Sequence, residues 1–248
     1  MRTIDLNCDM GEGCGNDEVL LDYVSSANIA CGFHAGDEET MRRTAKVAMA
    51  KNVAIGAHPS FPDRENFGRT NMNLSPDEVF EIVSEQIAAM QSICRESGAM
   101  LHHVKPHGAL YNMAAKEASL AEAIARAVKN IDSGLVMYGL SGSFLISEAQ
   151  KLGLKTASEV FADRTYTAEG ALTPRSQPDA LIKDTAQSID QVLQMLDKGV
   201  VTATNGDDVP IKAETVCIHG DGPHAVEFAI AIRTRFEQEG IKVCPTQR

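Results

Sequence analysis

Acidic and histidine residues in this chain stand directly after short apolar runs. The run at 3–8 leads into the carboxylate of Asp9, and a glycine-rich turn then brings a second carboxylate, Glu12. Five of the seven histidines also follow such runs: His34, His58, His107, His219 and His224. Carboxylates and imidazoles are the usual groups of general acid–base catalysis and of metal binding. If the runs are neighbouring strands, this placement predicts that these groups share one site.

Further polar groups stand in or after the same runs and are candidates for binding substrate or phosphate. They are Asn7, Asp37, Arg69, Tyr111, Asn112, Arg164, His219 and Asp221. Lys105, in "VKPHGALYN", is a cation at the end of the fourth run and joins the catalytic candidates. In parallel α/β folds, ligands bind beyond the carboxyl ends of the strands. We therefore expect these residues to converge although they are far apart in the sequence.

The elements that must position them follow a repeating order. Eight apolar runs have the length and the Ile, Val and Leu content of strands, at 3–8, 26–31, 53–57, 100–105, 134–138, 155–161, 214–218 and 241–244. Between most of them apolar residues recur at helical spacing, as Met41, Ala45 and Ala48 do. This order predicts a mainly parallel sheet with helices outside it. Seven or eight such units predict a TIM-like α/β barrel, with a doubly wound open sheet as the alternative.

Local signals add detail to this pattern. The segment "SPDE" at 75–78 predicts a helix that begins with a Ser cap and a Pro in its first turn. Two long connections, 58–75 and 162–187, are rich in Pro, Gly and polar residues. Long ordered loops in compact domains are often functional. The segment 199–213 has the pattern of an irregular strand pair.

Composition limits the classes of protein to consider. A chain of 248 residues can form one barrel domain, 1–248, without division into two. The net charge of −11 argues against a nucleic-acid binder, which needs a basic surface. No run approaches the ~20 apolar residues of a membrane span, and the N-terminus has no apolar signal region. The six cysteines form no CxxC pair, which favours reduced thiols in the cytoplasm.

A divalent metal ion is one interpretation of the acid and histidine residues. A carboxylate and two histidines from different strand ends can hold an ion that activates water. Asp9, His34 and His58 are the candidate ligands. The sequence has no HExxH or other local ligand spacing. The same residues are therefore equally suited to acid–base work without a metal and to binding oxyanions.

Two common nucleotide motifs do not fit this sequence. The segment "GDGPHA" at 220–225 matches G-x-G-x-x-A, but only one further strand can follow it. A dinucleotide-binding half-domain therefore does not fit. The sequence also has no G-x-x-x-x-G-K-[ST] loop for a nucleoside triphosphate and no G-x-S-x-G nucleophile motif.

Five longer segments resemble a known family. "DLNCDMGEG", "ANIACGFHAGD", "GAHPSFPD…FGR", "VKPHGALYN" and "CIHGD" are similar to the LamB/YcsF family of 5-oxoprolinase A subunits, in the same order over nearly the whole chain. The resemblance implies a distorted (β/α) barrel similar to that of polysaccharide deacetylases. It also implies ATP-dependent opening of 5-oxoproline to L-glutamate. The resemblance further implies two partner subunits, which resemble the halves of an allophanate-hydrolase-like protein.

This reaction is consistent with the candidate residues. A five-membered lactam is a poor electrophile, and phosphorylation of its amide oxygen by ATP would activate it for attack by water. We expect Asp9 and Glu12 to be the water-activating or metal-binding carboxylates, and His34, His58 and His107 to be acid–base or ligand groups. Lys105, Arg69 and Arg164 are expected to hold anions. Because the chain has no P-loop, we expect the partner subunits to handle ATP partly or wholly.

Two other functions remain open on the sequence. The first is a stand-alone metal-dependent amidohydrolase or deacetylase on the same barrel, which would act on an amide without ATP. The second is a non-catalytic subunit that binds substrate for its partners, for which conservative replacement of Glu12 or His58 would leave turnover intact. The density of acids, histidines and lysine argues against the second function.

Overall fold

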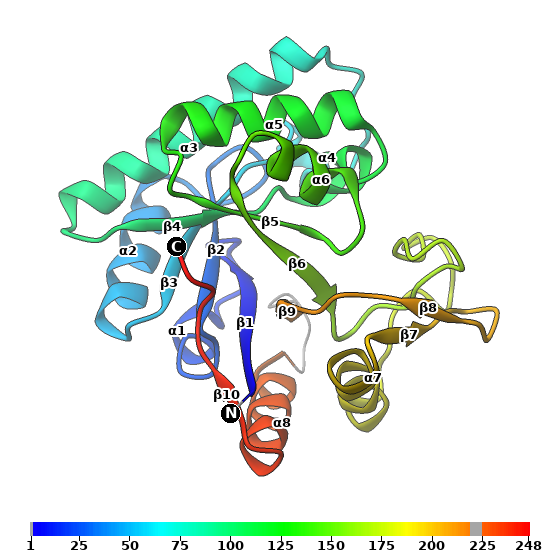
Figure 1. Cartoon of the computed structure of the whole chain (residues 1–248). Helices are drawn as coiled ribbons and strands as arrows, with labels where there is room; N and C mark the ends of the chain where they lie inside the picture. The colour runs from blue at the N-terminus through cyan, green and yellow to red at the C-terminus, as the bar shows by residue number, and fades with distance from the viewer. Residues whose placement is uncertain (1, 219–224) are drawn as a thin grey trace.

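Seven parallel strands close into a barrel in the computed structural model, which describes residues 2–218 and 225–248. In order around the barrel they are β1 (Arg2–Met10), β2 (Ser26–Ala30), β3 (Ala54–His58), β4 (Leu101–Val104), β5 (Val136–Leu140), β6 (Lys155–Phe161) and β9 (Thr215–Ile218). The barrel closes because β1 pairs with β2 on one side and with β9 on the other. A further strand, β10 (Ile241–Val243), pairs in parallel with the first residues of β1 (Figure 1). The predicted barrel is confirmed, and the open-sheet alternative is excluded.

Each strand begins and ends within two residues of the apolar run that predicted it. All five residues of β2 and all five of β5 are buried, polar ones included. Strands of a parallel sheet are covered on both faces, which explains their nearly continuous apolar sequences. The predicted strand pair at 199–213 is also present, as the antiparallel strands β7 (Val200–Thr202) and β8 (Asp208–Pro210).

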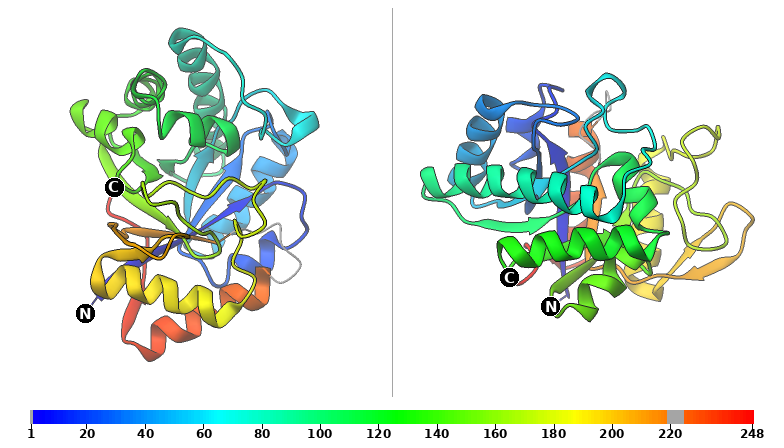
Figure 2. Two further views of the ribbon diagram at one scale, coloured as in Figure 1. Left: turned by 90° about the vertical axis from the view of Figure 1, so that its right-hand side faces the viewer. Right: turned by 90° about the horizontal axis from the view of Figure 1, so that it is seen from above.

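Helices surround the barrel in two groups (Figure 2). One group packs as a layer in which α3 contacts both α2 and α5, and α5 contacts α6; its members are α2 (Glu38–Ala50), α3 (Pro76–Glu96), α5 (Ala118–Ile131) and α6 (Phe144–Lys151). The other group is α7 (Thr185–Lys198) against α8 (Ala225–Gln238). Three short pieces stand at strand ends: α1 (Asp17–Leu20), the 3₁₀ turn η1 (Arg64–Asn66) and α4 (Gly108–Ala114). No helix in the described ranges is long and apolar enough to cross a membrane.

The start of α3 is fixed as the sequence predicted. Ser75 accepts a hydrogen bond from the Glu78 amide, and the Glu78 carboxylate accepts one from the Ser75 amide at 2.7 Å. This reciprocal capping box satisfies amide groups that have no partner within the helix. Of the predicted long connections, 58–75 contains η1, and 162–187 ends in the first turn of α7.

Two glycines bring the loops after β1 and β2 into contact at the open end of the barrel. Gly11 and Gly36 both have positive φ, at +73° and +71°. A Cβ atom on Gly36 would lie 2.6 Å from the carbonyl oxygen of Gly11, so a larger residue does not fit there. This close approach allows Glu12 of the first loop and His34 of the second to face each other.

Candidate active site

A cavity of about 710 Å³ opens at the carboxyl ends of the barrel strands. Most of the predicted site residues line it: Asp9, Glu12, His58, Arg69, Lys105, His107, Tyr111, Asn112 and Arg164. The segment 171–176 of the long loop after β6 forms another part of the wall. The cavity therefore lies at the end of the barrel where parallel α/β folds bind their ligands.

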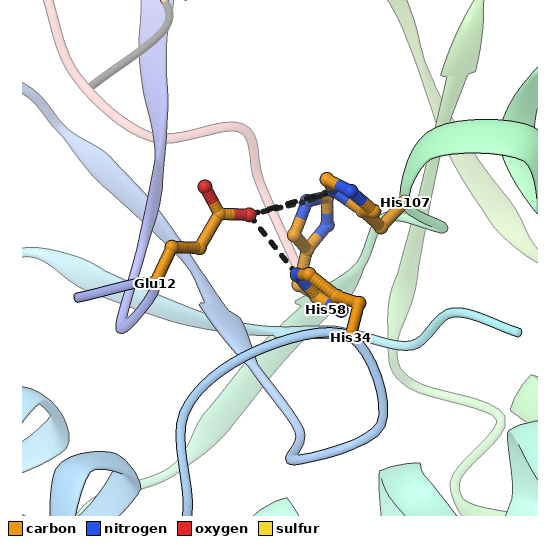
Figure 3. Close-up of side chains that lie close together, drawn as sticks. All are labelled: Glu12, His34, His58 and His107. Atoms are coloured by element: carbon orange, nitrogen blue, oxygen red, sulfur yellow. Dashed lines mark hydrogen bonds and ion pairs between the residues drawn. The ribbon is translucent and has the colours of Figure 1, made fainter. Parts of the chain in front are cut away.

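Glu12 and three histidines form a compact cluster in this region (Figure 3). The Glu12 Oε1 atom lies 3.0 Å from His34 Nε2, 3.4 Å from His107 Nδ1 and 3.9 Å from His58 Nε2. The four residues offer ligand atoms that all lie within 4.8 Å of one another. All three imidazoles are buried, and those of His34 and His107 stack with their centroids 3.8 Å apart.

Main-chain carbonyls fix the tautomers of two of these histidines. His58 Nδ1 donates to the carbonyl of Lys105 at 2.7 Å, and His107 Nε2 donates to that of Phe67 at 2.9 Å. A neutral imidazole that donates from one nitrogen has a lone pair on the other. His58 Nε2 and His107 Nδ1 thus face each other with lone pairs at 2.9 Å. Such an arrangement calls for a cation between them, either a proton or a metal ion.

Burial favours the neutral form of two histidines in this cluster, His34 and His107. It lowers the pKa of His34, although the hydrogen bond to Glu12 opposes the shift. It lowers the pKa of His107 well below the ordinary value, and the neighbouring His58 and His34 act in the same direction. Neutral histidine is the form that binds metal ions and accepts protons. The Nδ1 atom of His34 is buried and has no hydrogen-bond partner among the described residues.

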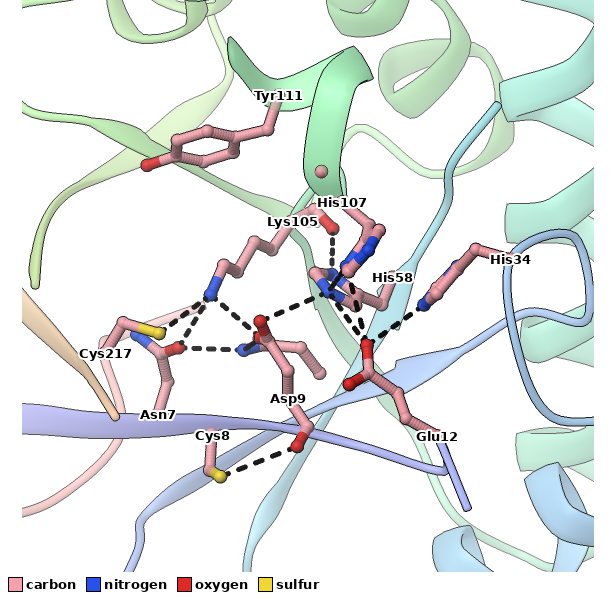
Figure 4. Close-up of polar contacts among 12 residues, drawn as sticks. Asn7, Cys8, Asp9, Glu12, His34, His58, Lys105, His107, Tyr111 and Cys217 are labelled. Atoms are coloured by element: carbon pink, nitrogen blue, oxygen red, sulfur yellow. Dashed lines mark hydrogen bonds and ion pairs between the residues drawn. The ribbon is translucent and has the colours of Figure 1, made fainter. Parts of the chain in front are cut away.

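Lys105 organises the second half of the site (Figure 4). Its Nζ atom lies 2.8 Å from Asp9 Oδ1, 2.9 Å from Glu159 Oε1 and 3.1 Å from Cys217 Sγ. Burial opposes the charge of Lys105, but Asp9 and the other acidic neighbours more than offset it and raise its pKa well above the ordinary value. Lys105 is therefore a fixed ammonium group, suited to stabilising negative charge rather than to acting as a base or nucleophile.

Hydrogen bonds to Glu159, the ion-pair partner of Lys105, connect Tyr111 and Asn7 to this half of the site. The Tyr111 hydroxyl donates to Glu159 Oε2 at 2.7 Å, and Asn7 Nδ2 donates to Glu159 Oε1 at 3.0 Å. Burial and the adjacent Glu159 raise the pKa of Tyr111 well above the ordinary value, so the hydroxyl stays protonated. Tyr111 contributes to the cavity wall as a neutral donor group.

Arginines occupy the outer part of the cavity. Arg164 is 5% exposed and donates to the main-chain carbonyls of Thr173 and Ala180. Burial and the neighbouring Arg175 lower the pKa of Arg164 to about 10. The guanidinium of Arg69 lies over the Phe67 ring, 4.9 Å from its centroid. Several guanidinium groups on one cavity wall favour an anionic ligand.

The remaining predicted residues lie at the rim of the cavity, outside it, or outside the described residues. Asp37 caps α2 by accepting from the Thr40 amide at 2.8 Å, and it lines a second cavity together with Glu12 and His34. Asn112 is exposed and bonds to the Gly108 carbonyl at the cavity rim. His219, Asp221 and His224 lie outside the described residues.

The predicted ligand set of Asp9, His34 and His58 stays a prediction, and the structure suggests a different carboxylate for it. The structure groups both histidines with Glu12 and His107 instead. Asp9 Oδ1 is held by Lys105 and by Asn28 Nδ2, each at 2.8 Å, while Oδ2 lies 3.4 Å from His58 Nε2. Asp9 therefore lies beside the histidine cluster and links it to Lys105.

Three buried members of the site are not among the predicted site residues. They are Asn28, Glu159 and Cys217, which surround Asp9 and Lys105 from β2, β6 and β9. The available signal was a polar residue within an otherwise apolar buried strand, which Asn28 and Glu159 both provide. Cys217 carries no such signal, because a buried cysteine is common in any core.

The fold defines the general class of this protein. The polysaccharide deacetylase Bc1974 from Bacillus cereus superposes with a TM-score of 0.53 at 12% identity, with 100% of this chain and 93% of that chain covered. At this identity the likeness shows the fold alone. The chain is thus a (β/α) barrel of the deacetylase-like type, as the resemblance in the sequence implied.

The family follows from closer comparisons. The model of the LamB/YcsF family matches residues 4–248, and the chain belongs to this family. A lactam utilization protein from Thermus thermophilus superposes with a TM-score of 0.92 at 43% identity, covering 98% of this chain and 100% of the other. Two proteins named as 5-oxoprolinase A subunits are also similar. The one from Brevibacillus brevis is 54% identical, covering 98% of both chains, and the one from Bordetella pertussis is 56% identical, covering 97% of both.

Proposed function

We propose that this chain is the A component of an ATP-dependent 5-oxoprolinase, which opens 5-oxo-L-proline to L-glutamate together with other subunits. The observation that supports this function best is the identity above 50%, over nearly the whole chain, with proteins named as 5-oxoprolinase A subunits. That name implies further subunits in the relatives. The cavity at the barrel mouth contains the acid, base and cationic groups that the reaction needs.

The charge of the cavity fits the substrate. The protein as a whole has a net charge of −11, yet cations outnumber carboxylates on the cavity wall. The cations are Arg69, Lys105, Lys116, Arg164 and Arg175, and the carboxylates are Asp9 and Glu12. 5-Oxoproline carries one carboxylate, and activation by ATP would add a phosphate. Guanidinium groups bind both of these anions with paired hydrogen bonds.

The residues support a sequence of steps on this substrate. ATP phosphorylates the lactam oxygen, water adds to the ring carbon, and cleavage of the C–N bond frees the amine and leaves a γ-acyl phosphate. A second water hydrolyses this acyl phosphate to glutamate and phosphate. Asp9, next to His58, is placed to take the proton of the attacking water, and a histidine returns a proton to the departing nitrogen. Lys105 stabilises negative charge that develops on oxygen. Because the sequence has no P-loop, the other subunits are the proposed source of the phosphoryl group.

A divalent metal ion fits the histidine cluster. Glu12, His34, His58 and His107 would hold it, because tautomers fixed by carbonyl groups aim two imidazole lone pairs at one point. Nitrogen and carboxylate ligands of this kind suit Zn²⁺ and similar transition metals. Such an ion would act as a Lewis acid on a carbonyl or phosphoryl oxygen.

Metal binding can be tested without an activity assay. Titration calorimetry with Zn²⁺ or Mn²⁺ on the chelator-treated chain should show one site, and the ion should raise the melting temperature. Glu12→Gln should weaken binding by at least about tenfold. Glu81→Gln, which changes an exposed carboxylate on α3, should not. Equal affinity in the two variants would exclude the Glu12 cluster as the site.

A stand-alone metal-dependent amidohydrolase is the second candidate, which the histidine cluster on a deacetylase-like barrel favours. An assay of L-glutamate release from 5-oxoproline separates the two functions. The proposed function predicts release only with the other subunits and ATP present. Release by this chain alone, independent of ATP and abolished by a chelator, would establish the second candidate.

A further inference from the structure

Polar side chains continue inward from the cavity into the closed interior of the barrel. Asn28 of β2 and His103 of β4 are both 0% exposed, and neither lines the cavity. A buried imidazole in a barrel core is costly unless its nitrogens have partners. His103 Nε2 lies 2.7 Å from Asn28 Oδ1, and its Nδ1 atom lies 3.2 Å from His102 Nδ1.

Asn28 connects His103 to the site. Its Nδ2 atom lies 2.8 Å from Asp9 Oδ1 and 2.7 Å from Asn7 Oδ1. A carboxylate only accepts hydrogen bonds, so the NH₂ end of the Asn28 amide must face Asp9. The oxygen of that amide then faces His103, which must donate to it from Nε2. A reversed amide would place its oxygen against the carboxylate and its NH₂ against the imidazole N–H.

The orientation of Asn28 also fixes the orientation of the Asn7 side-chain amide. Asn7 Oδ1 receives Asn28 Nδ2 and, at 3.3 Å, Lys105 Nζ. Asn7 Nδ2 consequently donates to Glu159 Oε1 at 3.0 Å and to Thr215 Oγ1 at 2.6 Å. The two amides are thus oriented in one consistent direction, and that direction requires a donor at His103 Nε2.

The barrel holds the His103 ring in one place. The ring stacks on Tyr138, with centroids 4.1 Å apart and planes at 15°. On β3 it lies against Gly56, where a Cβ atom would be 2.1 Å from His103 Nε2, so only glycine leaves room for the ring. Burial lowers the pKa of His103 well below the ordinary value, and the neighbouring His102 acts in the same direction. A neutral ring held in this way keeps a single tautomer.

We propose that His103 is a positioning residue for Asp9, acting through the side-chain amide of Asn28. Asn28 and Lys105 both bind Asp9 Oδ1, which turns Oδ2 toward His58 Nε2 at 3.4 Å. Loss of the His103 donor takes away the hydrogen bond that Asn28 Oδ1 accepts and that holds the amide from its far side, which weakens one of the two contacts that orient Asp9. This inference rests on the proposed role of Asp9 in ring opening.

The first test reads the tautomer directly. Long-range ¹H–¹⁵N NMR spectra of the isolated chain at neutral pH should show His103 as a neutral ring protonated at Nε2. A ring protonated only at Nδ1, or an imidazolium, would overturn the proposal. This measurement does not depend on what reaction the protein catalyses, so failure of the proposed function leaves it interpretable.

The second test uses variants in the complete enzyme with ATP and 5-oxoproline. His103→Leu should lower kcat by about 10- to 100-fold with little change in KM, as the loss of an outer hydrogen-bond partner commonly does. His103→Gln, whose amide nitrogen can replace Nε2 as the donor, should recover most of kcat. Tyr138→Phe, which keeps the stacked ring, should match wild type. Equal loss in the Gln and Leu variants, or full activity in the Leu variant, would overturn the proposal.

Discussion

Lys105 holds two buried carboxylates in place at the barrel mouth. Its Nζ atom lies between Asp9 and Glu159, at 2.8 and 2.9 Å, and the side chains of all three are almost fully buried. Removing one member of a buried ion pair is strongly destabilising, because the remaining charge has lost both water and its partner. The ammonium therefore contributes to stability and to the charge of the site.

We expect Lys105→Met to lower the free energy of unfolding by about 3–5 kcal/mol and to abolish ring opening, because it leaves Asp9 and Glu159 without their cation. Urea denaturation and the glutamate assay measure the two effects. Lys155→Met removes an exposed lysine from β6 and should change neither. A Lys105→Met protein as stable as wild type would show that the ion pairs do not hold the site together.

The buried histidines should make stability depend on pH. Burial lowers the pKa of His34, His102, His103 and His107. The unfolded chain takes up protons below its ordinary histidine pKa of about 6.5, while the folded chain does not until lower pH. Stability is therefore full above that value and falls as pH decreases through it, by up to about 1.4 kcal/mol per pH unit for each histidine.

Urea midpoints between pH 7.5 and 5.5, with a chelator present, measure this slope. His103→Gln removes one of the titrating groups and should give a shallower slope than wild type. Comparison of the two proteins also cancels the contribution of Asp5, whose pKa burial raises. Identical slopes would mean that His103 does not titrate between the folded and unfolded states as we infer.

Strand and helix order was predictable from local chemistry. Every apolar run became a strand, the helical spacing of Met41, Ala45 and Ala48 became α2, and the predicted helix start at 75–78 became that of α3. No helical spacing of apolar residues predicted α4, α6 or α7. Helices α4 and α6 span only 7 and 8 residues, too few to show a clear period. The start of α7 fell within a connection whose Pro and polar residues indicated a loop.

The cap of α3 should matter for stability but not for chemistry. Ser75→Ala removes the capping hydroxyl and should lower the free energy of unfolding by about 1 kcal/mol. Because α3 packs outside the barrel, away from the cavity wall, kcat should not change. Ser92→Ala, at an exposed position of the same helix, should have a smaller effect. Equal effects of the two substitutions would show that the capping box contributes nothing.

Barrel closure explains both what the sequence predicted about the site and what it did not. The position of polar residues after strand ends predicted a common site for Asp9, Glu12, His58, Lys105 and His107, although no local motif joins them. It did not predict which carboxylate would join the histidines, because that depends on how the loop after β1 meets the loop after β2. Nor did it predict the amides beneath the site, since their contacts exist only once β1, β2 and β4 enclose a common interior.

The central claim is that this barrel mouth opens the lactam with Asp9 as part of the reacting site. The most direct test compares ATP-dependent glutamate formation from 5-oxoproline by the complete enzyme assembled with wild-type, Asp9→Asn or Asp77→Asn chains. Asp77 is an exposed residue of α3 and controls for loss of a carboxylate. We predict that Asp9→Asn assembles normally and loses at least about 100-fold in kcat, while Asp77→Asn matches wild type. A correctly assembled Asp9→Asn enzyme with full activity would contradict the claim.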